Sequence, residues 1–477
     1  MLTQTALAAL TCLLFIGRKN FWLDESYSFV AAHRPLGDLL RLVTHDESNM
    51  SPYYLALHAW LRIGRSEGTI RLLSVPAAVA TVPVLYSLAR RLRGRRTAFV
   101  AGFLAAGNLM LVTYAQEARA YSLVLFLVTA SMLLFVELVS RPRIRVAVAW
   151  ALVSAFAVYA HYFAALVIVA QLASLLLLPR PQRPRSALVA AGGVAVLVAP
   201  LATFVLYRGT SPLSSAQSAS LLGPARLVYR YSGSLALAVV MAVLCGYAGL
   251  RTWRELQLRG WHRGPEAWRA LMPWIWLVLP ALLAFLGSLV HPMWKERYLI
   301  ISLPAFVLLV AAGIAGIETR ALRTVTAAVV GVLMVLALVG YYRGSVKQDA
   351  DWRAASAYTM ARTQPGDGLW FLPSTGYVPF AYYAWKRAQP PPPDTALTAD
   401  ALHGRIHPMV APPTMVAARL RALPRTCVIL LAPTLRNRRA FFSRQLRVVA
   451  HALVGFSPVA RRDFGPLLTV RCYIRTH

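Results

Sequence analysis

Charged residues are scarce in this sequence. Only 14% of the 477 residues are charged, whereas soluble domains carry roughly 25%, and 58% are hydrophobic. This composition and the mean hydropathy of +0.54 exclude a soluble globular domain and predict an integral membrane protein with many spans. Lysine is rarer still, with four residues against 46 arginines. Such an imbalance indicates a GC-rich genome and therefore a bacterial source.

Several familiar catalytic and binding motifs are absent. The sequence has no GxxxxGK[ST] loop and no strand-borne GxGxxG, which argues against nucleotide binding through those folds. It has no GxSxG elbow, which argues against a serine hydrolase. The net charge of +32 follows no RNA- or DNA-binding pattern, so we expect no nucleic acid partner. Basic loops instead orient a membrane protein and contact anionic membrane lipids.

Cysteine is also rare, with four residues in the chain. Cys12 and Cys245 lie in apolar segments, which favours inert buried thiols. Cys427 and Cys472 lie in strand-like runs near the C-terminus, and no CxxC spacing indicates a metal or redox site. A disulfide between these two is left open, because it requires that region to lie outside the cytoplasm.

Eleven apolar segments are predicted to span the membrane. They cover residues 2–17, 72–89, 97–113, 121–139, 146–160, 163–178, 186–206, 234–250, 271–290, 299–317 and 324–342. With a cytoplasmic N-terminus, the intracellular loops hold 18 basic residues and the later short outer loops hold six. This follows the positive-inside rule, although Arg18 and Lys19 lie outside the first span. The C-terminus is then extracytoplasmic.

The composition changes near residue 345. We therefore predict a transmembrane domain over residues 1–344, with a first outer loop at 18–71, and a small extracytoplasmic α/β domain over residues 345–477. In that second domain we expect strands at 369–372, 427–431 and 467–474, helices at 414–423 and 438–450, and an extended break at 389–393. Its basic surface fits lipid head groups or an anionic wall polymer, and equally an ordinary solvated face.

The first outer loop is unusually acidic, because it holds six of the 18 acidic residues of the chain. Asp24 and Glu25 directly follow Phe21-Trp22, an aromatic pair typical of a membrane interface. A carboxylate near a desolvating interface can have the raised pKa of a general base, so this pair is the first candidate for catalysis. The alternative is that Asp24 caps a helix.

Other polar groups collect where predicted spans end on the outer face. They are His45 with Tyr53 and Tyr54, then Gln116, Glu117 and Arg119, then His161 and Tyr162, and finally His291, Lys295, Arg297 and Tyr298. Arginine suits a phosphate because its planar fork donates two hydrogen bonds. The alternatives are interfacial ion pairs, tyrosine belts and snorkelling cations. The spacing of His45, Asp46 and Glu47 matches no standard metal site, so no metal ligand is assigned, although a divalent cation remains open.

These motifs together resemble a known family. They are Trp22-Leu-Asp-Glu-Ser26, Ser51-Pro-Tyr-Tyr-Leu55, Glu67 with Ile70-Arg-Leu-Leu-Ser74, Gln116-Glu-Ala-Arg119, His291-Pro with Glu296-Arg-Tyr-Leu299, and Asp351-Trp-Arg353. The arrangement resembles membrane glycosyltransferases of the GT-C fold, family 39 type, which include protein O-mannosyltransferases, aminoarabinose transferases and bacterial cell-envelope transferases. One departure is Ser51-Pro52, where many members have Pro-Pro.

The resemblance implies an inverting transferase of the bacterial cytoplasmic membrane. It would move one sugar, a hexose or a pentose, from a polyprenyl-phosphate donor to a hydroxyl of a glycan, glycolipid or protein acceptor on the outer face. Carried over, Asp24 is the base and Glu25 supports it or orients substrate. Glu117 is a second acidic residue, and Arg297 with Lys295 binds the donor phosphate.

Two other functions remain open. A flippase or transporter of lipid-linked sugars would need polar residues along a span, and charged residues in mid-span are nearly absent here. A non-catalytic envelope assembly protein would depend on its basic C-terminal domain and not on the outer-loop carboxylates. The clustering of polar residues on the outer face favours the transferase.

Overall fold

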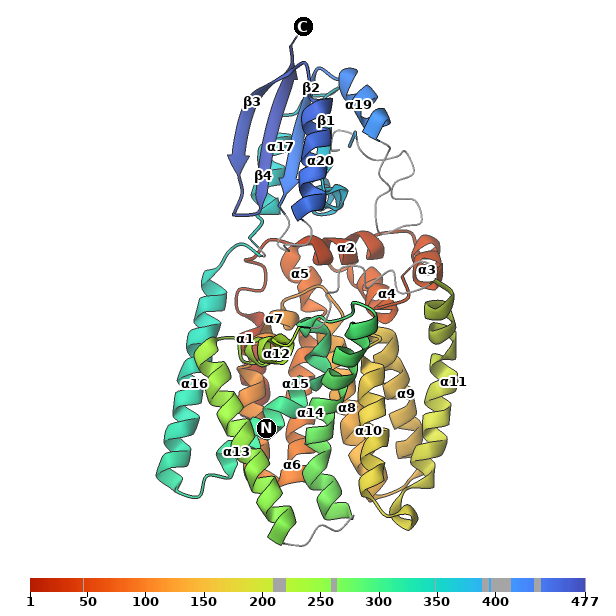
Figure 1. The fold of residues 1–477 in the computed structure, drawn as a ribbon, viewed down its shortest axis with the longest axis vertical. Helices are drawn as coiled ribbons and strands as arrows, with labels where there is room; N and C mark the ends of the chain where they lie inside the picture. Colours follow the sequence, from red (N-terminus) through yellow and green to blue (C-terminus); the bar gives the residue numbers. More distant parts are fainter. Residues whose placement is uncertain are drawn as a thin grey trace. The chain divides into compact units, whose positions relative to one another are not determined.

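The structure is a computed structural model that describes residues 1–45, 47–208, 220–258, 264–347, 349–387, 394–395, 413–432 and 439–476, and Figure 1 shows its helices and strands. The chain forms two compact units. The first unit comprises Met1–Ile16, Ser48–Tyr53 and Arg71–Arg343, and the second comprises Gly17–Glu47, Tyr54–Ile70 and Gly344–His477. The second unit therefore combines most of the acidic loop with the C-terminal region. The domain boundary after residue 344 stays a prediction.

The first unit is built of helices. They are α1 (Leu2–Leu13), α6 (Val75–Ala106), α7 (Leu109–Ala115), α8 (Tyr121–Ser140), α9 (Ile144–Ala160), α10 (Ala164–Ser174), α11 (Arg185–Arg208), α12 (Gly223–Ser232), α13 (Leu235–Leu258), α14 (Pro265–Val290), α15 (Leu303–Ala315) and α16 (Arg320–Arg343), with the 3₁₀ segments η1 (Leu175–Leu177), η2 (Arg180–Gln182) and η4 (Glu296–Ser302). Among the described residues, seven helices are long and apolar enough to cross a membrane, and α1, α9 and α10 are shorter apolar helices. The predicted polytopic helical membrane protein is confirmed, while the number of spans stays a prediction.

Helix α6 consists of two helices joined at Gly94. This residue has φ +85°, a conformation that side chains with a Cβ rarely adopt. Gly94 lies in the arginine-rich segment 90–96 that the sequence predicted as a loop between two spans. The segments 72–89 and 97–113 are therefore separate helical stretches, the second of which continues into α7. Helix α6 packs against α1, α8 and α15.

Small residues and internal hydrogen bonds hold these helices together. A Cβ at Gly313 of α15 would overlap the carbonyl group of Leu244 in α13, so only glycine permits this approach. Between α8, α9 and α10, the buried Gln171 amide accepts from Trp150 Nε1 (3.1 Å) and donates to Ser131 Oγ (3.0 Å). Such bonds satisfy polar groups that lipid cannot.

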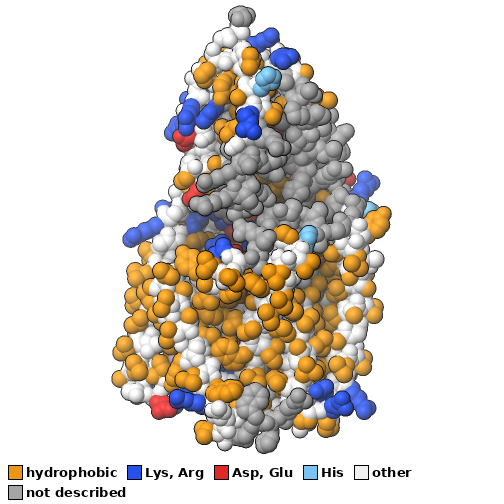
Figure 2. Space-filling model, viewed as in Figure 1, with side chains coloured by type: hydrophobic (Ala, Val, Ile, Leu, Met, Phe, Trp, Pro, Cys, Tyr) orange, Lys and Arg blue, Asp and Glu red, His pale blue; other side chains and the backbone are white. Residues whose placement is uncertain are grey.

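The outer helices of the first unit expose apolar side chains. The most apolar windows of α11 and α16 are only 17% buried within the protein. Figure 2 shows hydrophobic side chains covering the helical unit, with Lys and Arg gathered at its lower end. An apolar surface of this kind is stable only against lipid, so the first unit lies in a membrane.

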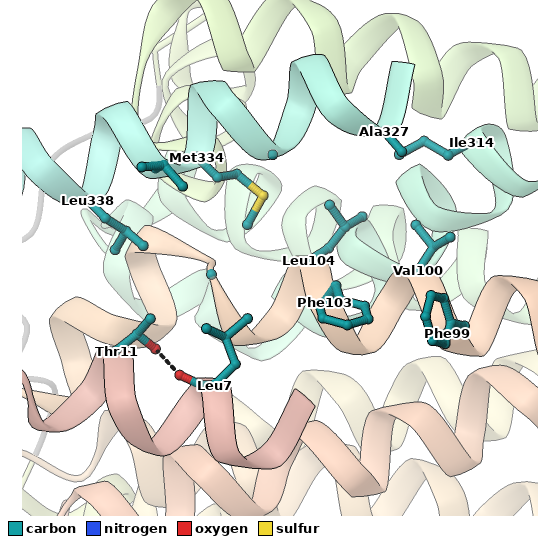
Figure 3. A pocket seen from close by; sticks show the side chains of 13 residues that line it. Leu7, Thr11, Phe99, Val100, Phe103, Leu104, Ile314, Ala327, Met334 and Leu338 are labelled. Atoms are coloured by element: carbon teal, nitrogen blue, oxygen red, sulfur yellow. Dashed lines mark hydrogen bonds between the residues drawn. The ribbon is translucent and has the colours of Figure 1, made fainter. Parts of the chain in front are cut away.

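An apolar cavity of about 390 Å³ lies within the first unit (Figure 3). Its lining comes from α1, α6, α15 and α16 and includes Leu7, Phe103, Met334 and Leu338. Among the described residues that line it, only Thr11 has a polar side chain. The Thr11 hydroxyl oxygen lies 2.8 Å from the carbonyl oxygen of Ala106 and 3.1 Å from those of Leu7 and Ala8, so its one proton is satisfied within the helices. The cavity therefore suits an apolar chain and offers nothing to a sugar or a phosphate.

The second unit contains a four-stranded sheet in the order β1-β2-β4-β3. Strands β1 (Gly368–Leu372) and β2 (Arg425–Leu431) are parallel, while β4 (Leu468–Arg475) pairs antiparallel with both β2 and β3 (Phe456–Asp463). Its helices are α2 (Leu23–Ala32), α3 (Leu36–His45), α17 (Trp352–Met360), α18 (Tyr377–Lys386), α19 (Pro413–Arg421) and α20 (Arg439–Ala452), with the 3₁₀ turn η5 (Ser374–Gly376). Helices α4 (Ser51–Trp60) and α5 (Glu67–Leu72) each have residues in both units.

The predicted α/β character of the C-terminal region is confirmed. Three strands and both helices match the expected segments, and β1 and β2 bury Trp370, Leu372, Val428 and Leu430 in a common apolar core. Strand β3 was not predicted, because most of its residues are exposed and its sequence has no apolar run. The predicted extended break at 389–393 lies outside the described residues.

The structure answers the question left open about the cysteines. Cys427 and Cys472 lie directly opposite each other on β2 and β4 and form a disulfide. Cys12 and Cys245 are free and buried, as their apolar segments indicated.

Candidate functional site

The acidic pair opens helix α2 in the second unit. The N-cap of this helix is Trp22, without a side-chain cap bond, and Asp24 and Glu25 lie in its first turn. The alternative that Asp24 caps the helix is therefore wrong. The helix dipole favours negative charge at both positions. Asp24 is partly exposed and Glu25 is fully buried, so of the two only Asp24 keeps contact with the surroundings.

Glu25 forms a buried ion pair with Lys347. The Lys347 Nζ atom lies 3.1 Å from Glu25 Oε2, and the two side chains are 8% and 0% exposed. The same ammonium group lies 6.0 Å from the centre of the Trp22 ring. A carboxylate removed from water needs such a partner, because an uncompensated buried charge is very costly.

A second buried carboxylate in this unit, Glu67, is held by two cations. Arg353 donates from Nε (3.2 Å) and Nη2 (3.0 Å) to Glu67 Oε1, and Lys386 donates to Glu67 Oε2. Glu67 is 5% exposed, whereas both cations are 42% exposed. This cluster ties the acidic loop to α17 and α18 within the second unit.

In the first unit, the turn between α7 and α8 carries the predicted residues Gln116, Glu117 and Arg119. The Gln116 amide donates to the carbonyl oxygens of Cys12 (3.0 Å) and Leu14 (2.7 Å), where α1 ends. Glu117 is buried, and its carbonyl oxygen accepts from Ser74 Oγ at 2.7 Å.

The predicted residue Tyr53 supports the same turn. Its hydroxyl lies 3.0 Å from Ser74 Oγ, which in turn bonds to the carbonyl oxygen of Glu117. A chain of hydrogen bonds thus fixes the backbone on which Glu117 and Arg119 are placed.

Cations and tyrosines meet beside this turn. We name the group of Arg119, Tyr121, Lys295, Arg297 and Tyr298 the cation–tyrosine cluster. The Arg297 guanidinium lies 5.9 Å from the Tyr121 ring and 5.6 Å from the Tyr298 ring, and the Arg119 guanidinium lies 6.0 Å from Tyr121. Lys295 Nζ lies 5.2 Å from the Tyr298 ring and 3.3 Å from its hydroxyl. Such contacts orient the cations and concentrate three positive charges in one place.

His161 adjoins the cation–tyrosine cluster and is neutral. Its ring lies 4.9 Å from the Tyr298 ring and 5.8 Å from the Tyr121 ring. Burial, and then the charges of Arg119, Arg297 and Lys295, lower the pKa of His161 to about 3. The backbone N–H of Phe163 donates to His161 Nδ1 at 3.2 Å, which leaves the ring proton on Nε2. Within the part of the chain that the structure describes, the buried Nε2 has no hydrogen-bond partner.

The other predicted residues have individual surroundings. His45 ends α3 and is exposed, with its Nδ1 atom 2.8 Å from Thr44 Oγ1. Tyr54 is buried, and the Tyr162 hydroxyl lies 2.6 Å from Ser48 Oγ. His291 is exposed at the end of α14. Their roles in substrate binding stay predictions.

The described residues contain no group of three or more His, Cys, Asp or Glu side chains arranged to hold a metal ion. The one sequence segment considered for a metal includes Asp46, which lies outside the described residues. The possible divalent cation therefore gains no assigned ligand.

The sequence analysis missed Lys347, Arg353 and Lys386 as partners of the loop carboxylates. The sequence did contain an indication of these partners, because lysine is rare, with four residues among 50 basic ones. Three of these four, Lys295, Lys347 and Lys386, occupy the ion clusters described above.

Comparisons with known proteins bear on the family and the fold of the chain. Residues 46–207 match the family model of the dolichyl-phosphate-mannose-protein mannosyltransferases. Among curated protein sequences, none matches the chain.

Solved structures match over nearly the whole chain. ArnT from Cupriavidus metallidurans in its apo state matches with a TM-score of 0.63 and 15% identity, over 99% of this chain and 97% of that one. The same protein bound to undecaprenyl phosphate gives a TM-score of 0.56 and 14% identity, with the same coverage. The oligosaccharyltransferase of Archaeoglobus fulgidus, tethered with an acceptor peptide, gives a TM-score of 0.54 and 9% identity, over 100% of this chain and 74% of that one. The GT-C fold indicated by the sequence motifs is confirmed.

Proposed function

We propose that this chain, which has the GT-C fold of membrane glycosyltransferases, transfers one sugar from a polyprenyl-phosphate donor to a hydroxyl group of a cell-envelope acceptor. The observation that carries the proposal is the cation–tyrosine cluster. A phosphate monoester or diester is bound by several positively charged side chains that donate hydrogen bonds. Arg119, Lys295 and Arg297 provide such side chains within a group of aromatic rings. The structure of ArnT with undecaprenyl phosphate supports a donor of this class.

His161 can also contribute to phosphate binding, as an uncharged hydrogen-bond donor. With its proton on Nε2 and its ring neutral over the physiological pH range, it can donate to a phosphate oxygen without needing to be protonated first. A buried N–H without a partner among the described residues is costly in the free protein and is satisfied when an oxyanion binds.

We assign the role of general base to Asp24, following the family resemblance. The acceptor oxygen attacks the anomeric carbon as Asp24 takes its proton, a new C–O bond forms, and the bond from that carbon to the phosphate oxygen breaks. The bonding electrons leave with the polyprenyl phosphate, whose charge the cations stabilise. One displacement inverts the anomeric configuration. Burial of Glu25 and partial exposure of Asp24 support this division of roles.

We place the reaction on the outer face of a bacterial cytoplasmic membrane. The basic residues are concentrated in the predicted cytoplasmic loops, which puts the carboxylates of the first loop outside. The disulfide between Cys427 and Cys472 supports an oxidising environment for the C-terminal region.

The test is sugar transfer by the purified full chain in nanodiscs. Radiolabelled polyprenyl-phosphate sugars, hexoses and pentoses in turn, are mixed with native envelope extract as acceptor. We expect the unchanged protein to transfer one of them and Asp24→Asn to lose at least about 1,000-fold in kcat, since a carboxamide cannot accept the proton.

Asp38→Asn is the matched control, because Asp38 is a first-turn acidic residue of the neighbouring helix α3, paired with Arg41 at 3.8 Å and exposed. Its activity should equal that of the unchanged protein. Full activity in Asp24→Asn would remove Asp24 as the base. Movement of the labelled lipid across the membrane of proteoliposomes, with no sugar transfer in nanodiscs, would favour a flippase.

A further inference from the structure

The buried pair of Glu25 and Lys347 joins two distant parts of the sequence within the second unit. Lys347 is 322 residues from Glu25 and follows the last long apolar helix, α16. Both side chains are buried, and their charged atoms lie 3.1 Å apart. The family resemblance assigned no role to Lys347, and exposed basic residues are far more common in this region of the chain.

Hydrogen bonds beside the ion pair join the same two segments, which are the residues before α2 and the C-terminal region after α16. The backbone N–H of Lys347 donates to Asn20 Oδ1 (2.8 Å), and Asn20 Nδ2 donates to the carbonyl oxygen of Ala350 (2.8 Å). The backbone N–H of Phe21 donates to the Tyr383 hydroxyl at 2.7 Å. The chain that leads into α2 is therefore held by the C-terminal region before the acidic pair begins.

The helix geometry separates the two carboxylates. Neighbouring residues of an α-helix point about 100° apart around its axis. Because Glu25 is turned into the protein toward Lys347, Asp24 leaves α2 in another direction and stays partly exposed. The contact of Glu25 with Lys347 thus sets the rotation of the first turn of α2, and with it the direction of Asp24.

We propose that Lys347 is a positioning residue for the general base. It neutralises Glu25, fixes the first turn of α2 and thereby aims the Asp24 carboxylate, so that the C-terminal segment is part of the catalytic machinery. The inference rests on the proposed function. It differs from a merely structural role because the consequence of losing Lys347 is a displaced Asp24, and a displacement of about 1 Å can lower turnover by roughly 100-fold.

The test uses variants of the full chain in nanodiscs. Lys347→Met keeps the length of the side chain and removes its charge, and we expect kcat to fall by about 100-fold with KM for the donor changed less than about threefold. Lys347→Arg keeps the charge and should recover activity to within about tenfold of the unchanged protein, because an arginine can still pair with Glu25. The double variant Glu25→Gln with Lys347→Met removes both charges and should be more active than Lys347→Met alone.

Lys386→Met is the matched control. It also removes a lysine of the second unit from a buried glutamate, but that glutamate is Glu67. We expect its Tm to fall while its kcat, measured on folded protein well below Tm, stays within about threefold of the unchanged protein.

The outcomes separate this inference from the proposed function. An unchanged kcat in Lys347→Met, with transfer by the unchanged protein intact, would overturn the positioning role alone. The positioning role would also be overturned if Lys347→Met lost activity only in proportion to its loss of Tm. It would likewise be overturned if neither Lys347→Arg nor the double variant recovered activity. Absence of transfer by the unchanged protein with every donor would overturn the proposed function itself, and the role of Lys347 in catalysis with it.

Discussion

The two units use charged residues in opposite ways. In the second unit the buried carboxylates Glu25 and Glu67 are bound by Lys347, Lys386 and Arg353 in close ion pairs. In the first unit the cation–tyrosine cluster sets three cations against aromatic rings at 5 to 6 Å. An ion pair at hydrogen-bond distance fixes the chain, whereas a cation near the face of an aromatic ring is oriented by the ring.

This difference separates anchors from ligand sites. Residues that hold the chain should change stability more than turnover when they are replaced, and residues that bind substrate should do the reverse. Lys347 is the informative exception, because it is an anchor placed next to the proposed base. Replacing one residue of each kind, and then the neutral His161, tests this difference.

Among the replacements that compare the two units, the largest effect should come from Arg297. Replacing it with methionine removes a guanidinium that lies between Tyr121 and Tyr298, and we expect kcat/KM for a polyprenyl-phosphate sugar to fall by about 100-fold, the value of one or two charge-assisted hydrogen bonds. Tm should change less than kcat/KM, because a residue that binds substrate affects turnover more than stability. Steady-state kinetics and thermal unfolding in nanodiscs measure the two effects.

Arg226 provides the matched comparison for Arg297. It lies in α12, is about half exposed and pairs with Glu296 at 3.8 Å. Arg226→Met should alter kcat/KM by less than about threefold, because exposed ion pairs contribute little. If both arginine variants lose activity equally, the assignment of Arg297 to the donor phosphate fails.

Glu67→Gln should act on stability instead. Glu67 is 5% exposed and meets two cations that are each 42% exposed, so solvent already screens part of the interaction. We expect the free energy of unfolding to fall by about 1–3 kcal/mol, less than for a fully buried pair. A chemical denaturation series would measure this change, and kcat below the transition should remain within about threefold. A large fall in kcat without a change in stability would move Glu67 into the catalytic group.

Much of the fold was predictable because membrane helices are encoded locally. The length and hydropathy of segments such as 121–139 and 271–290 predict α8 and α14 without reference to any other part of the chain. Strand β3 was not predicted because it is an edge strand whose residues are mostly exposed. Its sequence lacks the alternation of apolar and polar residues that β4 shows. Its pairing comes from its hairpin partner and not from its own sequence.

The candidate site was predictable in pieces. The turn at 116–121, the hairpin at 161–163 and the segment 291–298 each end an apolar helix with polar residues, so each was found separately. The sequence could not show that His161 and Arg297 approach the same tyrosines. Nor could it show the partner of Glu25, since Lys347 is 322 residues away and long-range pairing leaves no local pattern.

The smallest expected effect concerns His161. If its Nε2–H donates one neutral hydrogen bond to the donor phosphate, His161→Phe should raise KM for the donor by about 3- to 10-fold. Because the pKa of His161 is lowered to about 3, donor binding should show no titration of this residue between pH 5 and 8. His161→Gln, which keeps a donor, should recover part of the loss.

The same pKa gives a stability prediction with a definite sign. In the unfolded chain histidine takes up its proton near pH 6.5, whereas in the folded protein His161 stays neutral down to about pH 3. The unfolded state therefore binds more protons in this range, and the contribution of His161 is complete above about pH 6.5 and lost as the pH falls toward 3. His161→Phe should lessen the destabilisation between pH 6.5 and 5. Equal acid sensitivity in both proteins, or a donor KM that titrates near pH 6.5, would mean that His161 is protonated and pairs with the phosphate as a fourth cation.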